Sequence, residues 1–150
     1  MKQLNKTGDN LGGLLKIWAV PSGDFTLDGS TVNFISQSNI WEIHCSADSM
    51  EFTESSEVTP AGIHYNTVIS GFIPQDNANL QQAIEYLTPR KWAIIFMDGN
   101  GNYKLAGNQT NPLRSTTEIN TGKATASLAG CSIQFSGKTK TRAMFVNKPF

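Results

Sequence analysis

The segment from Lys91 to Arg114 reads KWAIIFMDGNGNYKLAGNQTNPLR and carries the strongest structural signal in the chain. Its run Trp92–Met97 is entirely apolar, which favours a strand buried on both faces. Asp98-Gly99 and Asn100-Gly101 follow at once, and both dipeptides favour tight turns because Gly and Asn accept a positive φ at little cost. The segment therefore predicts a β-hairpin over Lys91–Ala106 inside an all-β scaffold.

Outward from this hairpin, apolar and alternating runs predict about nine strands in total. The longest is Ile63–Ile73, in which successive side chains point to opposite faces. Phe25–Ser30 is expected to be a turn or loop, and Gly137-Lys138 a turn. The remaining strands are predicted at Leu14–Val20, Thr31–Ile35, Ile40–Cys45, Met50–Val58, Cys131–Ser136 and Arg142–Val146, with an exposed strand pair in Ser115–Ala126 that bends at Thr121-Gly122.

One helix is predicted, over about Asn77 to Leu87. Its apolar residues recur at helical spacing, and Asp76 or Asn77 is suited to cap its N-terminus. Thr88-Pro89 ends it, because the residue before a proline avoids the helical region. Together these elements predict a mainly β fold: an antiparallel β-sandwich or partly closed barrel with one flanking helix. We expect residues 14–150 to form a single domain and residues 1–13, polar and glycine-rich, to be a flexible arm.

The composition limits the classes of function. Charged residues make up only 16% of the 150 residues, below the roughly 25% of typical soluble domains. Twelve basic and twelve acidic residues cancel, so no global positive field attracts nucleic acid, and self-association is permitted. The chain has no apolar stretch of signal-peptide or membrane-spanning length. We therefore expect a cytoplasmic protein, or one exported by another route or released by lysis, that binds neither membranes nor nucleic acid sequence-specifically.

The loop that begins at Asp98 resembles the start of a calcium-binding loop, because oxygen-bearing side chains stand at alternate positions. A calcium hand also requires a glycine at its sixth position and a bidentate Glu at its twelfth. Here those positions hold Tyr103 and Gln109. The loop is therefore predicted to be a hairpin turn and not a metal site.

The chain has two histidines, His44 and His64, and two cysteines, Cys45 and Cys131. His44 and Cys45 are adjacent in a predicted strand, so their side chains should point to opposite faces. A pairing of His64 with Cys131 stays open, although no local pattern supports it. Two buried free thiols are favoured, and a disulfide is the alternative. We predict no catalytic residues and no cofactor.

Charged residues gather in two places. Glu51, Glu54 and Glu57, near Asp48, form an acidic stretch in which Glu51 and Glu57 should share one face of a strand. Lys138, Lys140 and Arg142 alternate and should line one strand face, with Lys148 nearby. Both groups are predicted to be solvated or to meet a neighbouring subunit rather than to bind phosphate.

From about Gly62 to Val146 the chain resembles small phage or prophage tail proteins, closest to the tail-tube-like and tail-assembly proteins of prophages in gut bacteria. The likeness consists of an Asp–Gly/Asn–Gly turn, a Leu-x-Gly segment, a Pro-Leu step, a Thr-Gly-Lys stretch and a strand ending in Phe-Ser-Gly. It implies a β-sandwich or barrel with one flanking helix that assembles into rings. The residues that carry it are Asp98, Gly99, Asn100, Gly101, Leu105, Gly107, Asn111, Pro112, Leu113, Thr121, Gly122, Lys123, Ala124, Phe135, Ser136 and Gly137.

The sequence thus favours a non-enzymatic structural protein of a phage tail, a homo-oligomer that also contacts other tail proteins and is cytoplasmic before assembly and part of the virion afterwards. Long polar strands would supply edges for pairing between subunits, and the N-terminal arm would order on a neighbour. The alternative is a monomeric β-sandwich that binds a small ligand or glycan. Exposed Trp18, Trp41 or Tyr65 would then be its stacking platform.

Overall fold

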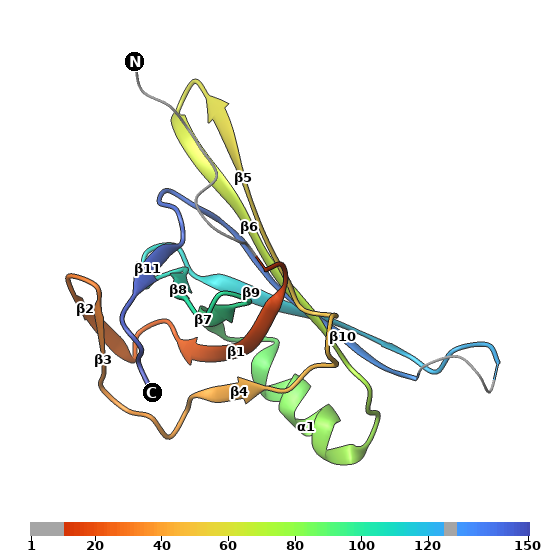
Figure 1. Ribbon diagram of the computed structural model, residues 1–150. Coiled ribbons are helices and arrows are strands. Elements are labelled where there is room, and N and C mark those ends of the chain that lie inside the picture. Colours follow the sequence, from red (N-terminus) through yellow and green to blue (C-terminus); the bar gives the residue numbers. More distant parts are fainter. Residues whose placement is uncertain (1–10, 125–128) are drawn as a thin grey trace.

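Strand β7 (Lys91–Asp98) is the centre of the fold, because it pairs with three other strands. The computed structural model describes residues 11–124 and 129–150 (Figure 1). One edge of β7 pairs along its length with β1 (Leu14–Pro21). Its other edge is divided: Lys91 and Trp92 pair with β9 (Leu113–Asn120), whereas Ile94–Met97 pair with β8 (Tyr103–Ala106). The sheet turns a corner where β7 changes partner.

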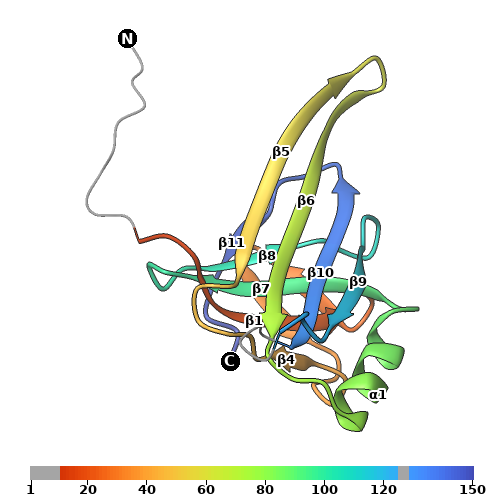
Figure 2. The same cartoon turned by 90° about the vertical axis from the view of Figure 1, so that its right-hand side faces the viewer.

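This corner folds one continuous antiparallel sheet into two layers. The first layer has the order β4-β1-β7-β8-β11, with β4 at Trp41–Ile43 and β11 at Met144–Val146. The second has the order β5-β6-β10-β9, with β5 at Glu51–Thr59, β6 at Gly62–Ile73 and β10 at Gly130–Thr139. Figure 2 shows that the strands of the second layer run across those of the first. The predicted β-sandwich with one flanking helix is confirmed, and it is a sandwich rather than a closed barrel.

The main core lies between the two layers. Trp92, Ile94 and Phe96 of β7 are fully buried there. They meet Ile69 of β6 and Phe135 of β10 from the opposite layer. Phe52 of β5 closes the core against Phe96, with ring centroids 4.6 Å apart. Every second side chain of β7 thus points into this core, so that one face of the strand is buried.

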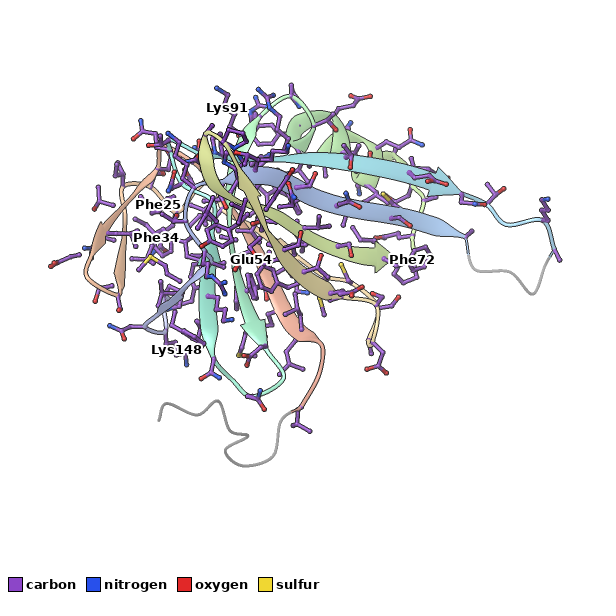
Figure 3. All side chains as sticks on the ribbon, turned by 90° about the horizontal axis from the view of Figure 1, so that it is seen from above. Phe25, Phe34, Glu54, Phe72, Lys91 and Lys148 are labelled. Carbon is purple, nitrogen blue, oxygen red and sulfur yellow. The ribbon has the colours of Figure 1, made fainter. Side chains whose placement is uncertain are left out.

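A second apolar cluster buries the other face of β7. Ala93 and Ile95 lie in it with Trp18 of β1. A separate hairpin, β2 (Phe25–Asp28) and β3 (Thr31–Phe34), covers this cluster. Phe25 and Phe34 are cross-strand partners on that hairpin and lie close together in Figure 3. The prediction that the apolar run of β7 is buried on both faces is therefore confirmed.

The helix α1 (Ala78–Leu87) forms as predicted, and its ends are held by specific hydrogen bonds. Asn77 is the N-cap, and its Oδ1 accepts a hydrogen bond from the Leu80 N–H at 2.9 Å. At the other end the buried Trp92 indole donates from Nε1 to the Leu87 carbonyl at 2.8 Å. The same carbonyl, one of those that a helix end leaves without an intrahelical partner, also accepts from the Arg90 N–H at 3.3 Å. The indole bond fixes the helix against the corner of the sheet.

Several predicted boundaries were wrong. Phe25–Asp28 is a strand and not a loop, since Gly29 adopts φ +61° in the turn that joins it to β3. Gly137-Lys138 is not a turn, because β10 continues through both residues to Thr139. The strand predicted over Ile40–Cys45 is limited to Trp41–Ile43.

The exposed region after Leu113 also differs from the prediction. Ser115–Ala126 is not a strand pair: a single strand, β9, ends at Asn120, and Thr125 and Ala126 lie outside the described residues. The strand count over the described ranges is eleven rather than about nine. Of the predicted N-terminal arm, residues 1–10 also lie outside the described part. Its last residues touch the Asp98 turn, where Gly99 N–H donates to the Gly13 carbonyl at 3.1 Å.

Candidate functional site

Most residues of the phage-tail resemblance lie in three separate places. The first is the Asp98 turn, where Asp98 Oδ1 accepts hydrogen bonds from the Asn100 and Asn102 N–H groups, each at 2.9 Å. Gly101 has φ +82° and closes the turn. The carboxylate thus organises the turn, and among the described residues no cluster of metal-ligating side chains is found. The prediction of a hairpin turn at this position is confirmed.

The second place is the corner of the sheet, where Gly107, Leu113 and Gly137 converge. Gly107 has φ +81°, and a Cβ there would lie 3.1 Å from Leu113 Cγ and 3.3 Å from the Trp92 carbonyl. A Cβ on Gly137 would lie 3.0 Å from both the Pro112 carbonyl and Leu113 Cδ2. Asn111 holds the preceding loop, since its N–H donates to Asn108 Oδ1 at 2.7 Å. These residues allow three backbones to approach closely.

The third place is the far end of β9, where Asn120 Oδ1 accepts from the Gly122 N–H at 2.7 Å. Thr121 Oγ1 donates to the Gly122 carbonyl. Leu105 belongs to none of the three places, because it is buried in the cluster on the other face of β7. All these residues have structural roles, and they do not meet at a common site.

The two histidines and the two cysteines lie in separate local environments. The His44 side chain is 82% exposed and lies 3.8 Å from Glu42. His64 Nε2 is 3.0 Å from Thr59 Oγ1 near a hairpin tip. Both cysteines are free, and burial, with a smaller effect of Cys131, raises the pKa of the Cys45 thiol to about 11. At neutral pH that thiol is protonated and a poor nucleophile.

The aromatic platform of the ligand-binding alternative is largely buried. Trp18 is only 7% exposed, so it is a core residue and does not supply the stacking platform that the ligand-binding alternative requires. Tyr65 is half-buried and lies under the Arg142 guanidinium, 5.1 Å from its ring centroid. Trp41 is half-buried and contacts Tyr86 at 5.4 Å between ring centroids.

The structure agrees with the prediction for the acidic stretch and disagrees with the prediction for the basic one. The faces predicted for the acidic stretch are confirmed: Glu51 and Glu57 are exposed, whereas Glu54 points inward and its Oε2 accepts from the Ala143 N–H at 2.7 Å. Figure 3 labels Glu54 close to the middle of the molecule. The predicted basic strip was wrong, because β10 ends at Thr139 and Arg142 turns back over Tyr65.

The second layer has two free edges, which sequence reasoning located only in part. β5 is the last strand of its sheet, so its outer side is unpaired over Glu51–Thr59 in the part of the chain that is described. β9 meets β7 only through Leu113 and Arg114. Over Ser115–Asn120 the same side of β9 faces no other strand of the described ranges. An unpaired edge presents N–H and C=O groups that can accept a further strand.

The outward face of this layer is polar. Its residues include Thr116, Glu118, Ser132 and Gln134, which line a shallow surface depression with Thr117. Hydroxyl and amide groups predominate, as the composition predicts. The face offers hydrogen bonds in both directions and no concentrated charge.

A groove lies at the end of the sandwich beside α1. It has a volume of about 200 Å³ and is mostly apolar. Ile73 at the end of β6 lines the groove, and Glu42 and His44 are among its polar lining residues. Its other apolar lining residues include Trp41, Ile43, Leu80, Ala83, Ile84 and Leu87.

Comparison of the chain with protein-family models, with curated proteins and with solved structures returned no match. The likeness to phage tail proteins therefore stays a prediction from the sequence. Over the described residues, none of the helices has the length and apolar character required to cross a bilayer.

Proposed function

We propose that this chain is a non-enzymatic structural protein of a phage or prophage tail that assembles through the edges of its second layer. The observation that carries the proposal is the direction of the two free edges. β5, β6, β10 and β9 alternate in direction, because each neighbouring pair is antiparallel. The two edge strands therefore run in opposite directions.

Opposite directions make head-to-tail joining favourable. When β5 of one copy lies beside β9 of the next, the new pair is antiparallel, and the alternation continues without interruption across the junction. Such a contact uses two different surfaces, so repetition generates a ring if the rotation closes. The affinity comes from backbone hydrogen bonds, as in other cases of strand addition.

The charges on β5 favour this arrangement over a symmetric dimer. β5 carries Glu51, Glu54 and Glu57 and no basic residue. Pairing of two β5 strands would bring these carboxylates close together, and like charges on paired strands are destabilising. The free part of β9, Ser115–Asn120, carries one charged side chain, Glu118. Joining unlike edges avoids most of this repulsion.

The two edges are also staggered. β5 lies opposite β6 from Gly62 to Ser70. The free part of β9 begins at Ser115, which is level with Ile69 through Phe135, and extends toward the opposite end of the sheet. Joining them requires one copy to shift along the strand direction. A constant shift of this kind tilts the strands, as closure of a sheet into a cylinder requires.

Two neighbouring proline variants test the edge. Successive N–H groups of a strand point to opposite sides, so Ser55→Pro and Ser56→Pro each remove a different group. One loses a hydrogen bond to β6 and should unfold at a lower temperature. The other loses only the free-edge N–H, and it should keep the wild-type melting temperature and lose assembly.

Assembly is read by light scattering at several concentrations, with electron microscopy of the same samples. Rings or a concentration-dependent oligomer of the wild type are expected. Normal assembly by the thermally stable proline variant would exclude the β5 edge. A strict monomer at every concentration would contradict self-assembly and favour the binding module, whose remaining candidate platform is Trp41 beside the groove.

A further inference from the structure

The hairpin β5–β6 extends beyond its neighbours and ends in an uncovered apolar tip. β10 ends at Thr139, opposite Tyr65, so the last residues of the hairpin have no third strand beside them in the described part of the chain. Val58 and Ile63 are cross-strand partners in this projecting part. They are 80% and 53% exposed. Together these two aliphatic side chains form a small apolar surface that contact with another molecule would bury.

These side chains belong to the core-facing side of the sheet. Side chains alternate along a strand, so Ile63 and Ile69 of β6 point to the same side. Val58 and Phe52 of β5 likewise share that side. Ile69 and Phe52 contact the main core. The tip therefore continues the core face into solvent.

The groove beside α1 lies at the other end of the same row of side chains. Ile73, at the end of β6, lines the groove and has the same parity as Ile63 and Ile69. The tip and α1 lie at opposite ends of the molecule in Figures 1 and 2. From Ile63 to Ile73 the strand spans roughly 33 Å, at about 3.3 Å per residue.

We propose that the tip formed by Val58 and Ile63 seats in the α1 groove of another copy of this chain, so that assembled rings stack along the direction of β6. This inference rests on the proposed function, because it places the contact between rings. A translation along β6 brings the tip of one copy to the groove of the next. Since translation does not rotate the molecule, the apolar side of the tip arrives facing the same side as Ile73 and the groove.

The polar groups at the two surfaces are compatible with this contact. Glu57 and His64 are cross-strand partners beside the tip. Glu42 and His44 stand at the groove. Glu57 and His64 point to the side of the sheet away from Val58 and Ile63, and at the groove His44 Nε2 lies 3.8 Å from Glu42 Oε2 of the same copy. No surplus of one charge opposes the approach.

The contact between one tip and one groove is small, so it should hold only when many copies of it form together between two rings. Two side chains bury too little surface to hold two single chains together. A ring presents one tip and one groove from every subunit, so after the first contact the others form within the same complex. Stacking should therefore follow ring formation and should not occur between monomers.

Single substitutions at exposed positions separate stacking from ring formation. Ile63→Asp places a charge in the tip, and Ile35→Asp is its matched control because Ile35 is also exposed, at 69%, but lies outside both surfaces. Both variants should keep the wild-type melting temperature. By electron microscopy, wild type and Ile35→Asp should form stacked tubes, whereas Ile63→Asp should form single rings with at least a tenfold lower fraction of stacked particles.

A cross-linking experiment tests the pairing directly. Val58→Cys and Ala83→Cys variants, the second altered in the groove, are mixed under mild oxidation. A covalent dimer that requires both variants supports the proposal, with each variant alone as the control for the native thiols. Stacks of wild-type length from Ile63→Asp, or no mixed dimer, would overturn it while leaving the rings intact. Absence of wild-type rings would instead overturn the proposed function and this inference with it.

Discussion

Replacement of Gly107 by alanine should destabilise the fold far more than the same change at Gly101. Both glycines have nearly the same backbone conformation, with φ +81° and +82°. Each alanine therefore carries a similar conformational cost, about 1–2 kcal/mol for an L-residue in the left-handed region. The two positions differ in what surrounds them.

At Gly101 an added Cβ meets nothing within 4 Å. At Gly107 it would lie 3.1 Å from Leu113 Cγ and 3.3 Å from the Trp92 carbonyl. Trp92 and Leu113 are fully buried, and they are one of the two residue pairs through which β7 meets β9. Overfilling a packed core costs about 1–3 kcal/mol. We therefore expect Gly107→Ala to lose about 2–5 kcal/mol in total and Gly101→Ala about 1–2 kcal/mol.

Urea unfolding followed by tryptophan fluorescence measures both variants, since the buried Trp92 lies at the corner. The midpoint should fall more for Gly107→Ala, with an unchanged slope if the unfolded state is unaffected. Equal destabilisation of the two variants would show that only the backbone conformation matters. It would refute the conclusion that close approach at the corner holds the two layers together.

Two further predictions concern single side chains. Glu54→Ala leaves the Ala143 N–H without its acceptor and should cost about 1–3 kcal/mol, whereas Glu54→Gln keeps an acceptor oxygen and should cost less; equal losses in thermal unfolding would argue against the hydrogen bond. Burial raises the pKa of the Cys45 thiol from 9.0 to about 11, so between these values the folded state holds more protons than the unfolded state and its stability falls as pH rises. Cys45→Ala should remove this part of the pH dependence, and identical pH profiles of wild type and variant would contradict it.

Patterns that depend on neighbouring residues could be predicted from the sequence. The apolar run Trp92–Met97 and the Asp98 turn predicted the central hairpin. The cap at Asn77 and the proline after Thr88 predicted the helix and its ends. The burial of β7 on both faces also followed, because six consecutive apolar residues leave no polar face for water.

Predictions of turns at glycines were wrong where the glycine is required by packing against residues distant in the sequence. Gly137 was interpreted as a turn, although it lies within β10 and allows the Pro112 carbonyl to approach. Phe25–Ser30 is predicted to be a turn or loop, although the Asp28-Gly29 dipeptide within it favours a hairpin and Phe25–Asp28 is a strand. The basic strip was wrong because alternation was assumed to continue past Thr139, where the strand ends.

Local sequence patterns were sufficient for the class of fold, the central hairpin and the helix, because strand alternation, turn chemistry and capping act between residues close along the chain. Tertiary packing was needed to show which edges are free and where the apolar tip and groove lie. Whether Ser115–Asn120 has a partner depends on where β7 leaves β9, and that depends on packing at Trp92 and Leu113. Val58 and Ile63 have the side chains of core residues, and they are exposed at the end of the hairpin that projects past the last β10 pairing at Thr139.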